Sequence, residues 1–139
     1  MTKIVLDTNI VLDLFVYSDP LQANLDKALQ AGTLQWLATP AMRVELARVL
    51  DYAQVAKRRL QNEQTVDAVL AQLDLLVTYV EAAPKAPYTC KDPDDQLFID
   101  LACQHQCLLL SKDNAVLAMR SRLARLGATV SRTLPSGYI

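Results

Sequence analysis

The chain has 139 residues, of which 52% are apolar and 21% charged, so it can bury a core and is not a disordered chain. Its 14 basic and 15 acidic side chains give a net charge of −1, which neither indicates nor excludes a nucleic-acid partner. No apolar run approaches the about 20 residues of a membrane-spanning helix. Asp7 and Asp13 interrupt the only stretch that could pass for a signal peptide, and the three cysteines form no disulfide pattern. We therefore expect a single domain over residues 1–139 in the cytoplasm, with no membrane association.

The first half of the chain alternates short apolar stretches with helical patterns. In order, we expect a strand at 3–6, a helix through 15, a helix from 19 to 32, a strand at 33–38 and a helix from 39–40. Asp19 and Pro20 suit an N-cap and a first helical turn, and Gly32 suits a helix end. Apolar residues at helical spacing predict the buried faces of the last two helices: Leu21, Leu25, Ala28 and Leu29, then Val44, Ala47 and Leu50.

The second half continues the alternation. A helix through 66–73 is followed by an extended stretch at 77–81, a proline-rich loop at 82–95, a helix around 97–102, a strand at 107–111, a helix from about 114 and a strand near 128–131. The stretch "CLLLS" at 107–111 is apolar up to its final serine, which is typical of a strand buried on both faces. The chain is therefore predicted to be α/β, with a central parallel sheet of four to five strands and helices on both faces.

Acidic residues recur where strands end or the following helices begin. In such sheets, ligands bind beyond the carboxyl ends of the strands. Four segments deliver carboxylates to this edge: Asp7 after the first strand, Glu45 in the helix after the second, Asp92, Asp94 and Asp95 before the helix that leads into "CLLLS", and Asp113 after it.

Each acid also has a structural explanation. Asp7, Asp113 and either Asp94 or Asp95 could cap helices, for about 1 kcal/mol each. Glu45 could pair with Arg48. Taken together, however, carboxylates about 4 Å apart repel by roughly 4 kcal/mol per pair at an effective dielectric near 20. A divalent cation offsets this repulsion, and all-oxygen ligands suit Mg²⁺ or Mn²⁺.

Two other features have less specific explanations. Basic residues gather at Lys57, Arg58 and Arg59 and again in the C-terminal part, at Lys112, Arg120, Arg122, Arg125 and Arg132. Such clusters are either a solvated face or a contact for a polyanion. The stretch "CQHQC" at 103–107 lacks an ordinary zinc spacing, which favours small core cysteines over a zinc site.

Four motifs, "VLDTNIVLDL", "ATPAMRVELARVL", "CKDPDDQLFIDLA" and "LLLSKDNAVL", together resemble the PIN domain family, in family order and over nearly the whole chain. The chain is most similar to members classed as toxins of bacterial toxin–antitoxin systems. The resemblance implies a PIN-like three-layer sandwich and a Mg²⁺- or Mn²⁺-dependent endoribonuclease. It also implies an RNA substrate, a cognate antitoxin protein as partner and a homodimer.

By position, the resemblance assigns metal-binding and catalytic roles to Asp7, Glu45, Asp95 and Asp113. Supporting roles fall to Asn9, beside the first acid, and to Ser111, two residues before the fourth. Asp92, Asp94 and Asp100 are less favoured ligands, and Arg43 is a candidate for binding the RNA backbone.

One departure concerns the number of ions. Many family members have a further acid where Ala115 stands, so either one ion or two could be held. The alternative function is a non-catalytic PIN-fold module that binds RNA or a protein partner, although the complete set of four acids favours the nuclease.

Overall fold

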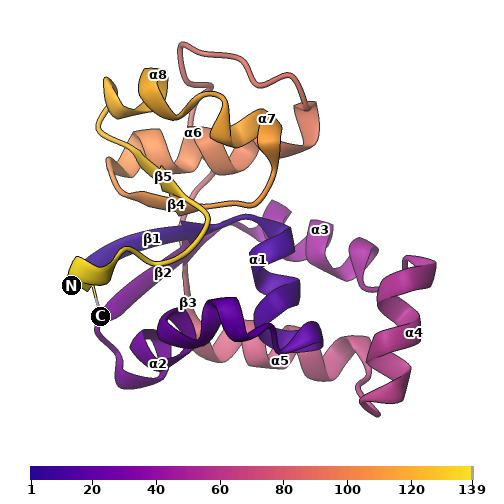
Figure 1. Cartoon of the computed structure of the whole chain (residues 1–139). Coiled ribbons are helices and arrows are strands. Elements are labelled where there is room, and N and C mark those ends of the chain that lie inside the picture. The colour runs from indigo at the N-terminus through magenta and orange to yellow at the C-terminus, as the bar shows by residue number, and fades with distance from the viewer. Residues whose placement is uncertain (139) are drawn as a thin grey trace.

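The computed structural model describes residues 1–138, in which strands and helices alternate (Figure 1). The strands are β1 (Thr2–Leu6), β2 (Leu34–Ala38), β3 (Val77–Tyr79), β4 (Leu108–Leu110) and β5 (Thr129–Ser131). The α-helices are α1 (Thr8–Leu12), α2 (Ala23–Ala31), α3 (Pro40–Val49), α4 (Ala53–Gln61), α5 (Val66–Leu76), α6 (Gln96–His105), α7 (Asn114–Leu117) and α8 (Arg120–Ala124). A π-helical turn (Asp13–Tyr17) continues α1, and 3-10 helices span Pro20–Gln22, Pro93–Asp95 and Ser136–Tyr138.

All five strands are parallel, in the order β3-β2-β1-β4-β5, so β1 lies at the centre of the sheet. Ile4 and Leu6 of β1 pack into the core on one face, and Val5 packs into the core on the other. Figure 1 shows α6, α7 and α8 on one side of the sheet and α2 and α5 on the other. The predicted α/β architecture, a parallel sheet covered on both faces, is confirmed.

Polar caps begin the helices where the sequence predicts them. The Asp19 side chain accepts a hydrogen bond from the backbone N–H of Leu21, and Thr39 accepts one from Met42. Gly32 ends α2 with φ of 74°, a left-handed conformation that glycine adopts without steric strain.

Two predicted helix faces need correction. Leu21 is 66% exposed and Val44 70% exposed, so neither is part of the core. The residues that α3 buries are Met42 and Leu46, with Leu50 at its C-cap. The buried face of α3 is therefore rotated relative to the predicted face.

Helix α4 has no counterpart in the predicted elements, and the helix predicted from about 114 is divided into α7 and α8. Helix α4 is mostly polar and buries only Val55 and Arg59. The Arg59 guanidinium donates to the carbonyl oxygens of Leu50, at 3.3 Å, and Gln64, at 2.9 Å. Arg59 therefore links the residues just before α4 to the residues just after it. It is not part of an exposed basic cluster.

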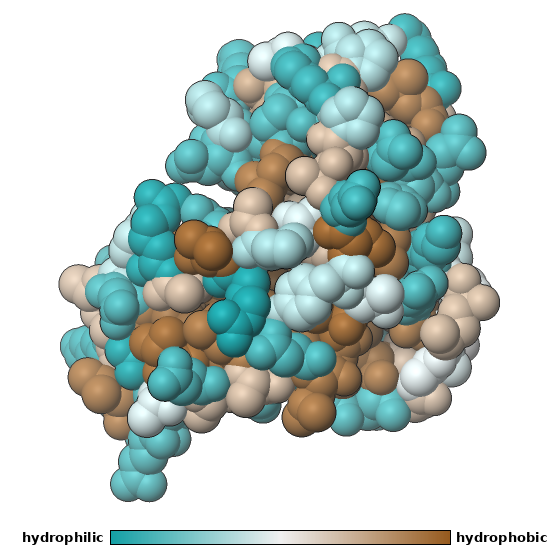
Figure 2. All heavy atoms as spheres, turned by 180° about the vertical axis from the view of Figure 1, so that it is seen from behind, coloured by the Kyte–Doolittle hydropathy of each residue, from teal (hydrophilic) through white to brown (hydrophobic). Residues whose placement is uncertain are grey.

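The surface carries apolar side chains in separate groups. Figure 2, the face opposite to that of Figure 1, shows these groups among hydrophilic residues. Exposed examples are Val44 on α3, Leu60 on α4 and Leu75 on α5. Within residues 1–138, no helix combines the length and apolar character needed to cross a bilayer.

Candidate metal centre

Three aspartates from two segments of the chain meet beyond the carboxyl end of the sheet. Asp113 lies in the loop after β4, Asp92 is the N-cap of the 3-10 helix that precedes α6, and Asp95 is the last residue of that 3-10 helix. One carboxylate oxygen from each of these residues lies within 4.8 Å of the other two. Figure 1 shows α7 and the start of α6 close together at this end of the sheet. In Figure 2, the surface is notched between the layer with α6 to α8 and the layer with α3 and α4.

Three acids cap the element that follows them. In each, Oδ1 accepts the backbone N–H two residues on, at 3.1 Å for Asp7, 3.0 Å for Asp92 and 2.8 Å for Asp113. A cap requires only one carboxylate oxygen and fixes the direction of the other. Capping and metal binding are therefore compatible roles for the same side chain.

Asp95 has no capping role. It is only 7% exposed, its side chain makes no hydrogen bond to the N-terminus of α6, and its Oδ2 has no hydrogen-bond partner within the described residues. A buried polar atom without a partner costs about 1–3 kcal/mol. A local structural role does not account for this carboxyl group.

Burial and the neighbouring acids raise the pKa of two members of the cluster, Asp95 and Asp7. Burial raises the pKa of Asp95 to about 8, with further contributions from a hydrogen bond to the Asp113 carboxyl and from the charges of Asp7, Asp113 and Asp92. Burial also raises the pKa of Asp7, and the charges of Asp113 and Asp92 raise it further. The hydrogen bonds from Ser111 and from the Asn9 N–H lower the pKa of Asp7 in part. The cluster therefore attracts a positive charge, either a proton or a cation.

Ser111 joins Asp7 to the other acids. It is fully buried, and its hydroxyl donates to Oδ2 of Asp7 at 2.6 Å. The Ser111 hydroxyl oxygen in turn accepts a hydrogen bond from the backbone N–H of Asp113 at 3.1 Å. Both oxygens of Asp7 thus have a fixed donor, so its carboxylate is held in one orientation beside the loop that carries Asp113.

The donor set fits a hard divalent cation. It consists of carboxylate oxygens alone, and one of them, Oδ2 of Asp95, is buried without a donor. Magnesium and manganese prefer such ligands, whereas zinc sites generally include histidine or cysteine. Asp92, Asp95 and Asp113 could hold an ion, with Asp7 beside them.

Glu45 lies outside this group. Its carboxylate forms an ion pair with Arg48, three residues further along α3. Helix α3 begins directly after β2, at the same edge of the sheet as the aspartates. The ligand role of Glu45 stays a prediction.

Two further candidate ligands also lie outside the group. Asp94 is exposed, and its contact with the cluster is its backbone N–H, which donates to the capping carboxylate of Asp92. Asp100 Oδ1 accepts hydrogen bonds from the Ala86 backbone and the Gln96 side chain, both at 2.8 Å. Asp100 therefore anchors the long loop after β3 to α6.

The remaining candidates make unexpected contacts. Asn9 contacts Asp7 through its backbone N–H, while its side chain is exposed. Arg43 forms a two-pronged ion pair with Asp74 of α5, with both distances 3.0 Å. An RNA phosphate would have to compete with that carboxylate for the Arg43 guanidinium.

Sequence patterns gave no sign of a buried ion pair next to the site. Asp13 is only 4% exposed, and the Lys112 ammonium lies 2.7 Å from its Oδ2. Lys112 stands between Ser111 and Asp113, so the pair holds the loop after β4 against the π-helical turn after α1. Nothing in the local sequence links two residues so far apart.

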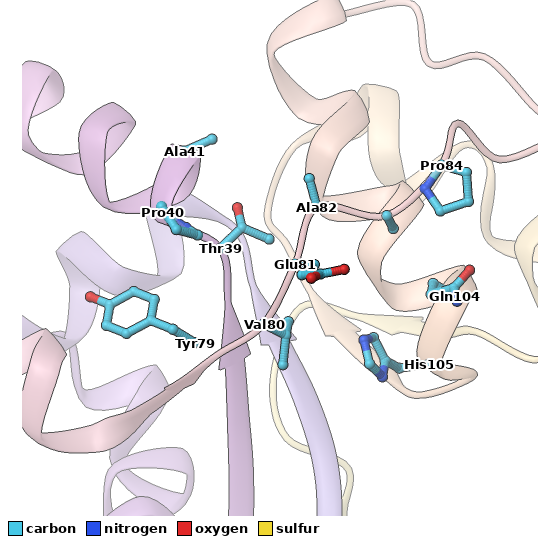
Figure 3. Close-up of a pocket in the computed structure, with 11 residues that line it drawn as sticks. Thr39, Pro40, Ala41, Tyr79, Val80, Glu81, Ala82, Pro84, Gln104 and His105 are labelled. Atoms are coloured by element: carbon cyan, nitrogen blue, oxygen red, sulfur yellow. The ribbon is translucent and has the colours of Figure 1, made fainter.

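A wide cavity of about 970 Å³ opens elsewhere, along β3 and the C-terminal end of α6. Figure 3 shows Tyr79, Val80 and Glu81 on one side of it and Gln104 and His105 on the other. Glu81 is the only carboxylate in its lining, so this cavity has no acid cluster. The candidate metal ligands are the aspartates instead.

Comparison with known families identifies the chain. A sequence model described as PIN domain matches residues 3–115, a range that contains Asp7, Asp92, Asp95 and Asp113. The chain belongs to the PIN domain family. PIN domains are generally nucleases and typically use divalent metal ions, in agreement with the acid cluster. A search of curated protein sequences found no match.

Proposed function

We propose that this PIN domain is a metal-dependent endoribonuclease that hydrolyses RNA phosphodiester bonds with Mg²⁺ or Mn²⁺. The observation that carries the proposal is the convergence of Asp92, Asp95 and Asp113 within 4.8 Å, beside an Asp7 fixed by Ser111. Asp95 supports a metal centre over simple capping, because it is buried, caps nothing and has an oxygen without a donor.

Each residue has a distinct task in this proposal. Asp92, Asp95 and Asp113 bind the ion, and Asp7 binds it or orients a water in its coordination shell. Ser111 holds Asp7 in the required orientation. Asp95 keeps its proton while the site lacks a cation and releases it when the positive charge of an ion stabilises its carboxylate. The bound ion would lower the pKa of a water molecule and neutralise charge on the leaving oxygen.

The number of ions depends on Glu45. With Ala115 at the position of the further family acid, the cluster offers ligands for one well-held ion. A second ion would need Glu45 to leave Arg48 and turn toward the aspartates. We propose that Glu45 binds in this way when substrate brings additional negative charge to the site.

We also propose that the protein is the toxin of a toxin–antitoxin pair and forms a homodimer, on the strength of the four family motifs. An antitoxin segment that places a positively charged side chain, such as arginine, at the aspartates would compete with the metal ion.

Growth arrest on induction of the wild type, relieved by Asp7→Asn, would support the toxin role. Arrest by both proteins would contradict it. A single species of monomer mass in sedimentation would contradict the dimer.

The nuclease proposal is tested with single-stranded RNA and DNA of one sequence, in Mg²⁺ and in EDTA. We expect the wild type to cut the RNA only with metal. Asp7→Asn should reduce the rate at least 100-fold while the circular dichroism spectrum is unchanged. Asp94→Asn is the matched control, because Asp94 carries the same charge next to the cluster but lies outside it. Equal cleavage by wild type and Asp7→Asn would refute the assignment, and binding without cleavage would favour a non-catalytic module.

A further inference from the structure

A smaller, basic cavity lies beyond the end of β5. It has a volume of about 460 Å³ and is lined by Asn114, Leu117, Ala118, Arg120, Ser131 and Arg132. The polar side chains of this lining are two guanidinium groups, an amide and a hydroxyl, with no carboxylate. The cavity therefore offers hydrogen-bond donors and positive charge to a ligand.

These two arginines differ from other basic residues of the C-terminal part. Lys112 is paired with Asp13, and Arg122 lies over an aromatic ring, 5.9 Å from its centroid. Within residues 1–138, neither Arg120 nor Arg132 lies within ion-pair distance of a carboxylate. Their charges are available to an anion.

The cavity adjoins the metal centre. Asn114 directly follows Asp113, and its Oδ1 accepts a hydrogen bond from Arg132 Nη2 at 3.3 Å. The backbone carbonyl of Ser131 accepts the N–H of Ser111 at 3.0 Å. Ser131 lines the cavity and Ser111 binds Asp7, so the two sites lie at the ends of neighbouring strands. Neighbouring strands are about 4.8 Å apart. The cavity and the aspartates therefore share the segment that begins α7, since Asp113 belongs to the cluster and Asn114 lines the cavity.

We propose that Arg120 and Arg132 form a subsite for an RNA backbone phosphate adjacent to the phosphate that is cut. This inference rests on the proposed nuclease function and names the part of the substrate that the neighbouring cavity holds. A guanidinium group matches phosphate oxygens through paired N–H donors, and the Asn114 amide can add a donor. Two neighbouring phosphates then bind differently: one at the acids through a metal ion, and one at the arginines directly. Both arginines lie beyond the range that the family comparison matches.

The subsite is tested by fluorescence anisotropy with a labelled single-stranded RNA at several salt concentrations. All proteins carry Asp7→Asn, so that no RNA is cut. Arg120→Gln and Arg132→Gln should each raise Kd about 3- to 10-fold. The slope of log Kd against log salt should fall by about 0.7 for each phosphate contact removed. Arg125→Gln is the matched control, since Arg125 is exposed near the end of the same helix but does not line the cavity.

The outcomes separate this inference from the nuclease proposal. Equal weakening by all three arginine variants would refute the subsite, because it would show an unspecific effect of charge. Loss of binding confined to Arg120→Gln and Arg132→Gln would support the subsite, even for a protein that fails to cut RNA. In the cleaving protein, the two variants should raise KM about as much as Kd and leave kcat within twofold. Release of the RNA by micromolar inorganic phosphate would instead assign the cavity to a small anion and overturn the RNA proposal.

Discussion

Replacement of Asp95 by asparagine should stabilise the protein when no metal is bound. In the wild type, the Asp95 carboxyl lies within 4.8 Å of two other carboxylates. If Asp95 were ionised, each such pair of charges would repel by about 3 kcal/mol at an effective dielectric near 20. The folded protein avoids this repulsion by keeping the Asp95 carboxyl protonated, which costs free energy at any pH above the ordinary pKa of an aspartate. Asparagine has nearly the same shape, has no charge and can donate to Asp113. We expect a gain of about 1–3 kcal/mol in unfolding free energy at pH 7 in EDTA, or about 3–10 °C in Tm.

The gain should depend on pH with a defined sign. The folded-state pKa of Asp95 is raised to about 8 from an ordinary value of 3.8, so between these values the folded wild type binds a proton that the unfolded chain has lost. The contribution of Asp95 to stability is therefore fully present below pH 4 and is lost as pH rises to about 8. The advantage of Asp95→Asn should be near zero at pH 4 and grow toward pH 8.

Urea unfolding in EDTA at pH 4, 6 and 8 measures this directly, with Asp94→Asn as control. Saturating Mn²⁺ should reverse the order, because the wild type gains about 2.7 kcal/mol at 100 times its Kd and Asp95→Asn gains less. A variant less stable than wild type at pH 7 in EDTA, or a difference that does not change with pH, would refute the repulsion account. It would instead support a purely structural role for Asp95.

Three further predictions concern neighbouring residues. Lys112→Met should lower the unfolding free energy by about 2–4 kcal/mol, because it leaves the buried Asp13 carboxylate unpaired. Adding Asp13→Asn should restore at least half of the lost unfolding free energy. No restoration would contradict the pairing of Lys112 with Asp13. Ser111→Ala should weaken Mn²⁺ binding about 10- to 100-fold in calorimetry by removing the donor that orients Asp7, whereas an unchanged Kd would contradict that role. Glu45→Gln should slow RNA cleavage at least tenfold without affecting binding of the first Mn²⁺, and an unaffected rate would exclude Glu45 from the reaction.

The sequence predicted the fold well where burial alone decides structure. Strands β1 and β4 are apolar at successive positions because both faces of the central sheet are covered, and that pattern is visible in one dimension. Helix α4 could not be found in this way. Arg59 is buried there through hydrogen bonds to carbonyl groups outside the helix, and a charged residue in the sequence carries no sign of such partners.

The site was predictable only in part, for a similar reason. Asp7 and Asp113 follow strands directly, so strand order places them at one edge of the sheet. The choice among Asp92, Asp94 and Asp95 depends on the turn of the 3-10 helix, which directs the first and third toward Asp113 and leaves the second in solvent. Spacing along the chain does not contain that information.

Anomalous diffraction from a wild-type crystal soaked in Mn²⁺ would locate an ion at the aspartates. We expect a manganese peak between the carboxylates of Asp92, Asp95 and Asp113, with oxygen ligands at about 2.0–2.2 Å. The peak should disappear in Asp113→Asn crystals. Ordered carboxylates with no peak between them at saturating Mn²⁺ would show that the three aspartates do not form a metal centre.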